Sequence, residues 1–434
     1  MKPVMESVRL KEGDGEEFTC DEEPHMLPPE TGYGYLALTL GHHLDQDKRD
    51  LEIVRKLGWG GYSNVWLATP HKYATTSSPL VFFDLITHSR KDYRSKYVAV
   101  KVMTVNATAG AVYGHMNEVK SLRLVTSKNP DHPGYKHCVT VEDLFIEKGK
   151  YGPHYCLVTQ VHGRHMDALQ SDLQDHHFSV SATKRIIKQT LLALDYLHTE
   201  CKLIHGDLKP ANILYSPSYQ DDAIARHIED SPSSSYEPRL EPDLSPDPII
   251  TVRSQPLPNF GLQEDMSNIN ICLVDYGETA SAEQEHTHPS QPTLLRAPEV
   301  VVGYPWSTAV DIWSIGGLVF EFLIGNPFFA LYETDSVSLE DSLLRRMIEH
   351  IGPFPPHLLE KGTRRDEYFD AEGTLIRVKE FRPQSIEDCL KIYNILDSAD
   401  IAPAAAFIRR CLTMDPEKRP TAKELLEDEW LKDA

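Results

Sequence analysis

Short runs of alternating apolar and polar residues dominate the chain between residues 51 and 161. This period-two pattern predicts half-buried β-strands, and apolar residues at helical spacing over 115–125 predict one helix among them. The chain therefore begins with a strand-rich lobe. Its predicted strands are 51–57, 64–68, 96–103, 139–146 and 155–161.

After residue 163 the pattern becomes mainly helical. The segment 182–198 carries its apolar residues on one face, which is typical of an amphipathic helix. The apolar segment 310–324 is shorter than a membrane span and contains Asp311 and Glu321, so it predicts a buried helix. The predicted fold class is α+β, with a small strand-rich lobe followed by a larger helical lobe.

Two segments have a composition that does not favour a packed core. Residues 1–32 are rich in acidic residues and proline, and we expect a disordered arm there. The lobes would then be 33–162 and 163–434. Residues 216–270 are dense in Ser, Pro, Asp and Glu, which predicts an unstructured spacer inside the second lobe, between the short strands 213–215 and 271–274.

The charge of the chain is unusual for a protein of 434 residues. A formal net charge of -21 disfavours direct binding of nucleic acid or of an anionic membrane and favours basic partners, although the acidity could serve solubility alone. The seven cysteines include no C-x-x-C pair, which suits a reducing compartment. We expect no signal peptide, because the N-terminus lacks a basic segment followed by an apolar one.

A glycine-rich turn joins the first two predicted strands. Glycines let backbone N–H groups approach phosphate oxygens closely, although an ordinary hairpin can also carry them. A strand follows the turn, which argues against a dinucleotide-binding fingerprint, since there a helix follows. The nucleotide-binding residues expected here are Leu57, Gly58, Trp59, Gly60, Gly61, Tyr62, Ser63 and Val65.

A lysine lies within the apolar strand 96–103. Lys101 is costly to bury unless it is paired, and Glu118 on the following predicted helix is an available partner. Such a pair would hold the phosphates of a nucleotide. The alternative is that Lys101 simply reaches the surface.

The segment His205–Asn212 is the most specific chemical signal in the chain. Phosphoryl transfer needs a carboxylate to accept the substrate hydroxyl proton, and Asp207 suits this role as catalytic base. Lys209 would supply positive charge beside the γ-phosphate. Asn212 would be a ligand of Mg²⁺. Asp275, which follows the strand 271–274 and begins an Asp-Tyr-Gly sequence, would be the second Mg²⁺ ligand.

Two long-range contacts are expected to support this segment. Glu299 would pair with Arg419 near the C-terminus. The buried Asp311 must be satisfied, and backbone N–H groups of the catalytic loop are suitable donors.

In these motifs the chain resembles the eukaryotic protein kinases and, more narrowly, the SR-protein kinase family, particularly its divergent fungal members. The glycine turn, the spacer and residues 369–375 carry the narrower resemblance. It implies a bilobal protein kinase fold and an ATP-dependent, non-specific serine/threonine kinase using Mg²⁺. The expected substrates are basic, arginine/serine-rich proteins such as splicing factors, and the expected role is in mRNA splicing regulation. We expect a monomer in cytoplasm and nucleus.

The resemblance also implies an adenine site. Val65 and Ala99 would cover the base, the backbones of Gln160 and His162 would bind its edge, and Thr159 would limit the back of the pocket.

Four residues near the catalytic residues depart from the family pattern, and one of them is Tyr276, in the place of the usual phenylalanine or leucine. Gly206 occupies the place of the usual arginine before the catalytic aspartate. Pro292 and Leu295 replace a threonine and a tyrosine in the segment that shapes the pocket for the residue after the phosphorylated serine.

We also expect an acidic docking site for basic segments near Glu340 and Asp341. The alternative is an acidic loop that is only solvated.

The alternative function is a pseudokinase that acts as a scaffold without phosphotransfer. Pseudokinases usually lack one of the catalytic groups, whereas Lys101, Asp207, Asn212 and Asp275 are all present here. A small-molecule kinase is disfavoured, because the Ala297-Pro298-Glu299 segment and the spacer serve protein substrates.

Overall fold

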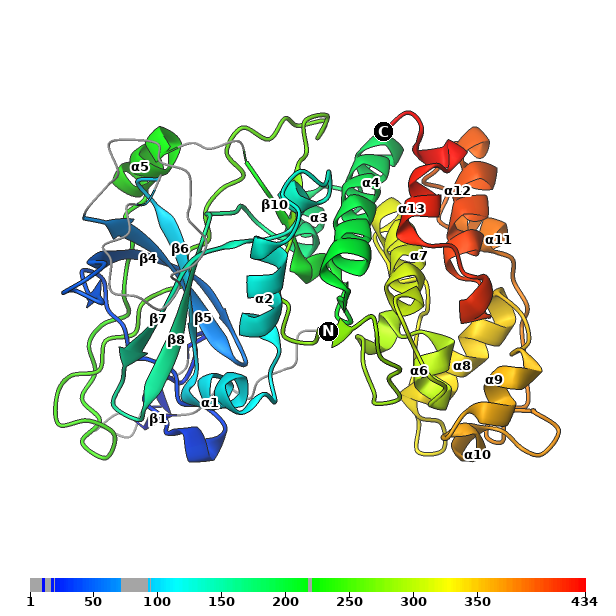
Figure 1. Ribbon diagram of the computed structural model, residues 1–434, viewed down its shortest axis with the longest axis horizontal. Coiled ribbons are helices and arrows are strands. Elements are labelled where there is room, and N and C mark those ends of the chain that lie inside the picture. Colours follow the sequence, from blue (N-terminus) through cyan, green and yellow to red (C-terminus); the bar gives the residue numbers. More distant parts are fainter. Residues whose placement is uncertain (1–9, 12–16, 19, 72–92, 94, 218–220) are drawn as a thin grey trace. The chain divides into compact units, whose positions relative to one another are not determined.

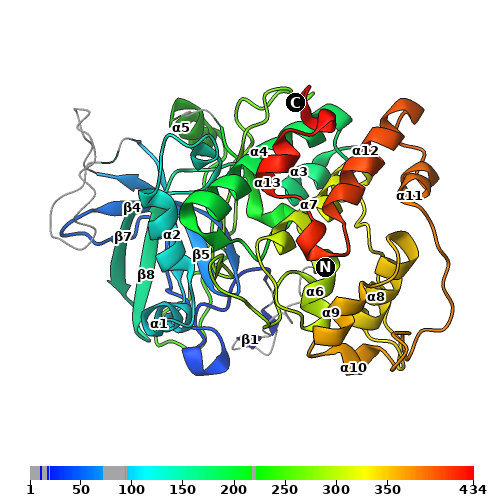
Figure 2. The same cartoon turned by 45° about the vertical axis from the view of Figure 1, so that its right-hand side comes forward.

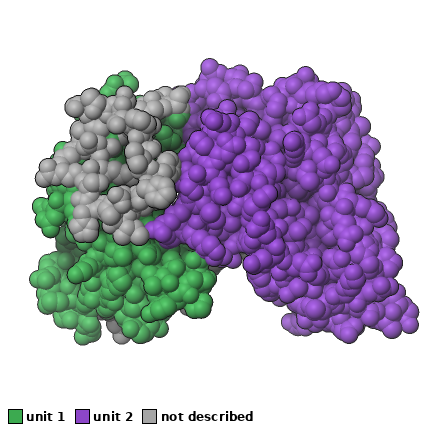
Figure 3. All heavy atoms as spheres, viewed as in Figure 1, with its two compact units in different colours: residues 1–116, 140–163, 217–260 green, residues 117–139, 164–216, 261–434 purple. Residues whose placement is uncertain are grey.

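The computed structural model describes residues 10–11, 17–18, 20–71, 93, 95–217 and 221–434. The chain forms two compact units (Figure 3). Unit 1 comprises residues 1–116, 140–163 and 217–260, and unit 2 comprises residues 117–139, 164–216 and 261–434.

Unit 1 is built on a six-stranded antiparallel sheet with the strand order β3-β4-β5-β6-β8-β7 (Figure 1). Every second residue along parts of β4, β5 and β6 faces one core, which includes Ile53, Trp66 and Val100. The sequence predicted β4 and β5 from short alternating runs and β6 from a near-continuous apolar run. The strands are β3 His43–Leu44, β4 Leu51–Gly60, β5 Ser63–Pro70, β6 Val98–Met103, β7 Val141–Lys148 and β8 Pro153–Thr159.

Part of the N-terminal arm is structured, contrary to the expectation of disorder over 1–32. Glu22 and Glu23 both accept hydrogen bonds from the buried Lys56 on β4, with an Nζ–Oε2 distance of 2.7 Å to Glu22. Asn64 donates to Glu23 at 2.9 Å. The acidic residues that suggested disorder in this arm include two that neutralise the buried ammonium of Lys56. Unit 1 also contains β1 Leu10–Lys11, β2 Glu17–Phe18, α1 Val105–Tyr113 and α5 Asp221–Asp230.

The spacer is also structured over most of its length, and residues 217–260 belong to unit 1 instead of the helical lobe. Ile224 of α5 and Leu257 are buried with Leu67 of the sheet. Arg55 on β4 donates to the carbonyl of Gln255 at 2.6 Å. The prediction of an unstructured spacer is wrong for the described residues, because a few apolar side chains and one buried arginine anchor a segment whose average composition is polar.

Unit 2 is mainly helical, and α7 packs between α4 and α12 (Figures 1 and 2). Nearly every residue of α7 is buried, as expected for a helix that is apolar on all sides. Two short strand pairs, β9 with β12 and β10 with β11, frame the catalytic loop. The strands are β9 Leu203–Ile204, β10 Ile213–Tyr215, β11 Ile271–Leu273 and β12 Ala280–Ser281. The helices are α2 Glu118–Ser127, α3 Met166–Asp172, α4 Val180–Tyr196, α6 Pro298–Val302, α7 Ala309–Ile324, α8 Leu339–His350, α9 Pro356–Lys361, α10 Arg365–Tyr368, α11 Ile386–Ile392, α12 Ser398–Cys411 and α13 Ala422–Leu426.

The order of an antiparallel sheet followed by a helical region confirms the predicted fold class. The helix α2 clusters with unit 2, although the sequence interpretation placed it in the first lobe. None of the helices described is both long and apolar enough to cross a membrane.

Candidate active site

The catalytic loop lies between β9 and β10 of unit 2, and its side chains converge on Asp207. The Nζ atom of Lys209 lies 2.5 Å from Oδ2 of Asp207. The side-chain amide of Asn212 donates to the same oxygen at 2.9 Å and to the backbone carbonyl of Asp207 at 2.8 Å. The Asp207 side chain is 15% exposed, so its carboxylate is held in one orientation and still reaches solvent.

Asp311, near the start of α7, fixes the backbone of the catalytic loop through hydrogen bonds. Its two carboxylate oxygens accept the backbone N–H groups of His205 at 2.8 Å and Gly206 at 3.0 Å. His198, in the π-helical turn that ends α4, donates to Oδ2 at 2.8 Å. Burial alone raises the pKa of Asp311, but these hydrogen bonds outweigh it and leave the pKa below its usual value. The expected role of Asp311 is confirmed.

The two candidate Mg²⁺ ligands lie at neighbouring strand ends. Ile213 pairs with Leu273 across β10 and β11, and the N–H of Val274 donates to the carbonyl of Asn212 at 3.0 Å. Asp275 follows Val274 directly, in the left-handed backbone region with φ 67°. Because the amide nitrogen of Asn212 faces Asp207, its amide oxygen remains as an acceptor, and together with the Asp275 carboxylate it suits the preference of Mg²⁺ for oxygen ligands.

His205 connects the catalytic loop to the strand before Asp275. Its Nε2 lies 3.2 Å from the carbonyl oxygen of Val274, and its Nδ1 lies 3.3 Å from the backbone nitrogen of Asp207. One tautomer satisfies both contacts, with Nε2–H as donor and Nδ1 as acceptor. The ring therefore couples the candidate base to the candidate metal ligand.

Gly206 is in close contact with the segment that follows Asp275. Its φ is 75°, and a Cβ atom there would lie 2.8 Å from the carbonyl oxygen of Glu278 and 3.3 Å from Oγ of Ser290. Ser290 and the backbone N–H of Gln291 both donate to the carbonyl of Gly206, at 3.2 Å and 3.1 Å. Sequence reasoning treated Gly206 as the loss of an arginine and missed this steric requirement.

Gln291 is a structural residue that sequence reasoning missed. Its buried amide nitrogen donates to the carbonyls of Leu295 at 3.2 Å and Val310 at 2.9 Å, and to Ser314 Oγ at 2.9 Å. Its amide oxygen accepts the N–H of Ala297 at 2.9 Å. One side chain thereby fixes the segment in which Pro292 and Leu295 depart from the family pattern. No local pattern signals this role.

The segment after Asp275 also contacts the N-terminal end of α2. Thr279 Oγ1 lies 2.6 Å from Oγ of Ser121, and Asn117 donates its amide to the carbonyl of Thr279 at 2.8 Å. Glu118, the first residue of α2, is 5% exposed. Lys101 lies on β6 of unit 1, so its pairing with Glu118 of unit 2 stays a prediction.

The predicted ion pair between Glu299 and Arg419 is confirmed. The guanidinium binds both carboxylate oxygens, at 2.7 Å and 3.1 Å, and both side chains are 0% exposed. Arg419 also donates to the carbonyl of Ala309 at 2.6 Å. It therefore links Glu299 of α6 to the first residue of α7.

The prediction of an acidic docking site is wrong for Asp341. Its carboxylate is fully buried and pairs with Arg377 at 2.7 Å. It also caps α8 by accepting the backbone N–H of Ser338, while Ser338 Oγ accepts the N–H of Asp341. Glu340 pairs with Arg296 at 3.2 Å. An acidic residue in a first helical turn often caps the helix, and that role explains the pattern here.

The predicted nucleotide residues lie in unit 1. Gly58, Trp59 and Gly60 end β4, and Tyr62 lies at the turn with 64% of its surface exposed. Trp59 donates its indole N–H to the carbonyl of Asp21 at 2.9 Å. Tyr35 donates to the carbonyl of Gly60 at 2.7 Å. Residues of the N-terminal segment thus form hydrogen bonds with both Trp59 and Gly60 of the glycine-rich turn.

The predicted adenine residues occupy adjacent strands of the same sheet. Val65 pairs with Lys101, and Ala99 pairs with Thr159. Thr159 donates its hydroxyl to the carbonyl of Gln160 at 3.2 Å. The strand register brings these residues together, and their contacts with a nucleotide stay predictions.

The ring of His162 lies in an unusual environment. Both ring nitrogens are buried, and neither has a hydrogen-bond partner among the described residues. Burial lowers the pKa of His162 to about 4, so the ring is neutral at physiological pH. Ile224, Leu257 and Phe260 from the spacer line the same small cavity.

The sequence profile of the protein kinase domain matches residues 85–230 and 259–431. The chain belongs to the protein kinase family. It is 27% identical to a serine/threonine-protein kinase SRPK of Physarum polycephalum over 397 residues, which cover 89% of this chain and 87% of the relative.

Two further relatives extend this similarity. Protein kinase dsk1 of Schizosaccharomyces pombe is 24% identical over 516 residues, covering 100% of this chain and 87% of the relative. SRSF protein kinase 3 of Mus musculus is 23% identical over 528 residues, covering 92% and 88%. The kinase is thus a member of the serine/threonine family and similar to SRPK kinases. Membership implies the use of ATP and a protein substrate.

Proposed function

We propose that this kinase is catalytically active and transfers the γ-phosphoryl group of ATP to serine or threonine, with Asp207 as the base. The arrangement around Asp207 carries the proposal. Lys209 and Asn212 both contact one carboxylate oxygen, and Asp311 holds the backbone of the loop. A scaffold without catalysis would have no need to keep this set of polar contacts intact.

Each residue has a defined task in this mechanism. Asp207 orients the substrate hydroxyl and accepts its proton. The ammonium of Lys209 stabilises negative charge on the transferred phosphoryl group. Asn212 and Asp275 would hold Mg²⁺, which neutralises charge on the phosphates when bound. Lys101 would bind the phosphates that stay with the nucleotide.

The proposed substrate class is a basic protein rich in arginine and serine, such as a splicing factor. A net charge of -21 attracts such substrates. Exposed Glu283 and Glu285 lie on the segment after Asp275, in the same unit as the catalytic loop. One relative is named an SRSF protein kinase. A monomer acting in cytoplasm and nucleus would be consistent with this role.

The first experiment tests catalysis by measuring phosphate transfer from labelled ATP to an arginine/serine repeat protein. The Asp207→Ala variant should lose about 10²–10⁴-fold in kcat and still bind ATP. Asp366→Ala, in which an aspartate side chain that is 92% exposed is removed, serves as the matched control and should keep full activity. An Asp207→Ala enzyme with more than half the wild-type rate contradicts the assignment.

The second experiment tests the substrate class and separates it from the catalytic proposal. The kinase is given arginine/serine, lysine/serine and glutamate/serine repeat peptides, and kcat/KM is compared. We expect the arginine/serine peptide to be preferred. Equal use of all three would refute the substrate class alone. ATP binding without transfer to any peptide, or to itself, would support the pseudokinase.

A further inference from the structure

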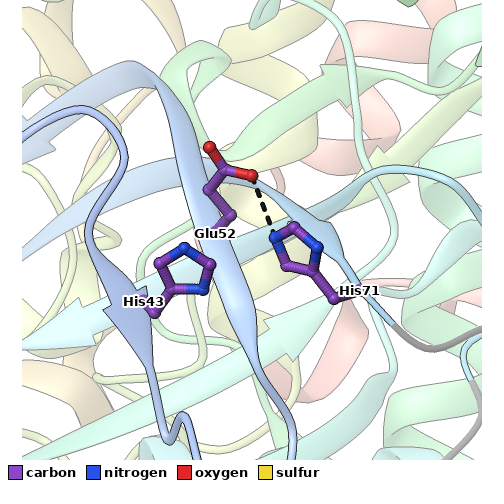
Figure 4. A group of neighbouring side chains, drawn as sticks. All are labelled: His43, Glu52 and His71. Carbon is purple, nitrogen blue, oxygen red and sulfur yellow. Dashed lines mark hydrogen bonds and ion pairs between the residues drawn. The ribbon is translucent and has the colours of Figure 1, made fainter.

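One edge of the sheet in unit 1 carries three side chains whose types can bind a metal ion, and they lie far from the catalytic loop in sequence. His43 lies on the edge strand β3 and pairs directly with Glu52 on β4. Glu52 pairs with Thr69 on β5, and His71 follows the end of β5. The strand register therefore places the three side chains beside one another (Figure 4).

Their donor atoms are close enough to share an ion. One ligand atom from each residue lies within 4.8 Å of the other two, and Nε2 of His71 is 2.9 Å from Oε2 of Glu52. The two imidazole rings are stacked, with centroids 4.9 Å apart. Ligands at about 2.0–2.1 Å from a tetrahedral ion lie about 3.3 Å apart. The widest of the three pairs therefore needs to close by at most about 1.5 Å, and Glu52 and His71 need to move apart by about 0.4 Å.

A carboxylate already orients one of the imidazoles. Oδ1 of Asp50 lies 2.7 Å from Nδ1 of His43, and the backbone carbonyl of Asp50 accepts the backbone N–H of His71 at 3.1 Å. A carboxylate on Nδ1–H fixes the tautomer and leaves Nε2 with its lone pair available for a metal. Asp50 thus orients the ring of His43 through its side chain and fixes the backbone at His71 through its carbonyl.

We propose that His43, Glu52 and His71 form a binding site for Zn²⁺, with water as the fourth ligand. Two imidazole nitrogens and one carboxylate oxygen match the preference of Zn²⁺. Mg²⁺ prefers oxygen ligands, so the ion expected at Asn212 and Asp275 does not compete for this site. The histidine side chains are 32% and 40% exposed, which leaves the ion a path from solvent.

A bound ion would connect three strands at a sheet edge. It would join the two-residue strand β3 to the start of β4 and to the end of β5. Zn²⁺ binding should therefore stabilise unit 1, by an amount that increases with the logarithm of the free Zn²⁺ concentration once this exceeds Kd. Its function would be structural, since it is made entirely of residues outside the proposed catalytic set.

The test is calorimetric titration of the full chain with Zn²⁺ in excess Mg²⁺, after removal of metals with a chelator. We expect one saturable site in the wild type. The double variant His43→Gln, His71→Gln should lose it, and Asp50→Asn should weaken it about 10–100-fold. His115→Gln, which removes an exposed histidine of the same unit, should bind Zn²⁺ as the wild type does.

A second measurement locates the ion. Crystals of the zinc-loaded protein should show an anomalous peak at the zinc edge about 2.0–2.1 Å from a ring nitrogen of both histidines. Unchanged affinity and stoichiometry in the double variant would overturn the proposal. An anomalous peak at other histidines only, such as His286 and His288, would overturn it as well. Retained phosphotransfer activity shows that the double variant is folded.

Discussion

Replacing Gly206 by alanine should disable the kinase through a backbone contact. The residue has a φ of 75°, where a side chain costs about 1–2 kcal/mol. The added Cβ would lie 2.8 Å from the carbonyl oxygen of Glu278, so the segment after Asp275 must move. If strain at that contact costs about another 1 kcal/mol, the total is about 2–3 kcal/mol.

This energy can be converted into an expected activity. When the cost falls on the arrangement that binds substrate, about 2–3 kcal/mol lowers the ratio of the competent to the displaced arrangement roughly 30–150-fold. We expect Gly206→Ala to reduce kcat/KM for the protein substrate by up to that factor. ATP affinity should change little, since the glycine-rich turn lies in the other unit.

Gly41→Ala is the matched control. Gly41 has a φ of 76°, and a Cβ there would meet no atom within 4 Å. Both variants carry the conformational cost, measurable as a reduced free energy of unfolding in urea, but only Gly206→Ala disturbs the segment. If kcat/KM falls equally in both variants, or stays above half the wild-type value in Gly206→Ala, the steric argument is refuted.

Three further predictions concern other parts of the kinase. Protein expressed in bacteria and treated with phosphatase should remain active, because neutral hydrogen bonds and the ion pairs of Arg296 and Glu299 hold residues 275–299 without a phosphate. An inert enzyme that recovers on phosphorylation would contradict this. Thr159→Met should weaken inhibitors that use space behind the adenine and spare ATP in competition assays, whereas equal loss of both would argue against the placement. Arg419→Ala should lower the free energy of unfolding by about 3–5 kcal/mol, because it leaves the buried Glu299 unpaired. Lys391→Ala, at a pair exposed on both sides, should change it by less than about 1 kcal/mol, and a similar loss in both would refute that reasoning.

The strands and the long helices were predictable because their signal is local. Alternation along β4 and β5 and the apolar run of α7 follow directly from which face of each element is buried. The predicted boundaries of these elements differ by a few residues from those in the structure. The helix α1 was missed, since its nine residues have only a weak amphipathic pattern.

The packing of the polar segments was not predictable from composition. Glu23 and Ile224 lie in stretches that look disordered on average, and each is buried by a partner distant in sequence. An average over tens of residues does not record one buried ion pair with Lys56 or one apolar anchor.

The sequence alone determined the family and the identity of the candidate catalytic residues. Asp207, Lys209 and Asn212 lie within six residues, so the chemistry of the loop can be read from their spacing. Phosphoryl transfer constrains these residue types strongly, and few other functions need them in this order.

Only the tertiary structure decided how those residues are held and what else the chain can bind. Asp311 reaches the catalytic loop across 106 residues of sequence, and Gln291 fixes its segment through bonds to α7. Strand register, and no spacing motif, brings His43, Glu52 and His71 together. Such contacts depend on which surfaces fold against each other. A local pattern does not contain that information, because the same residue types at the same spacing remain apart until the elements pack.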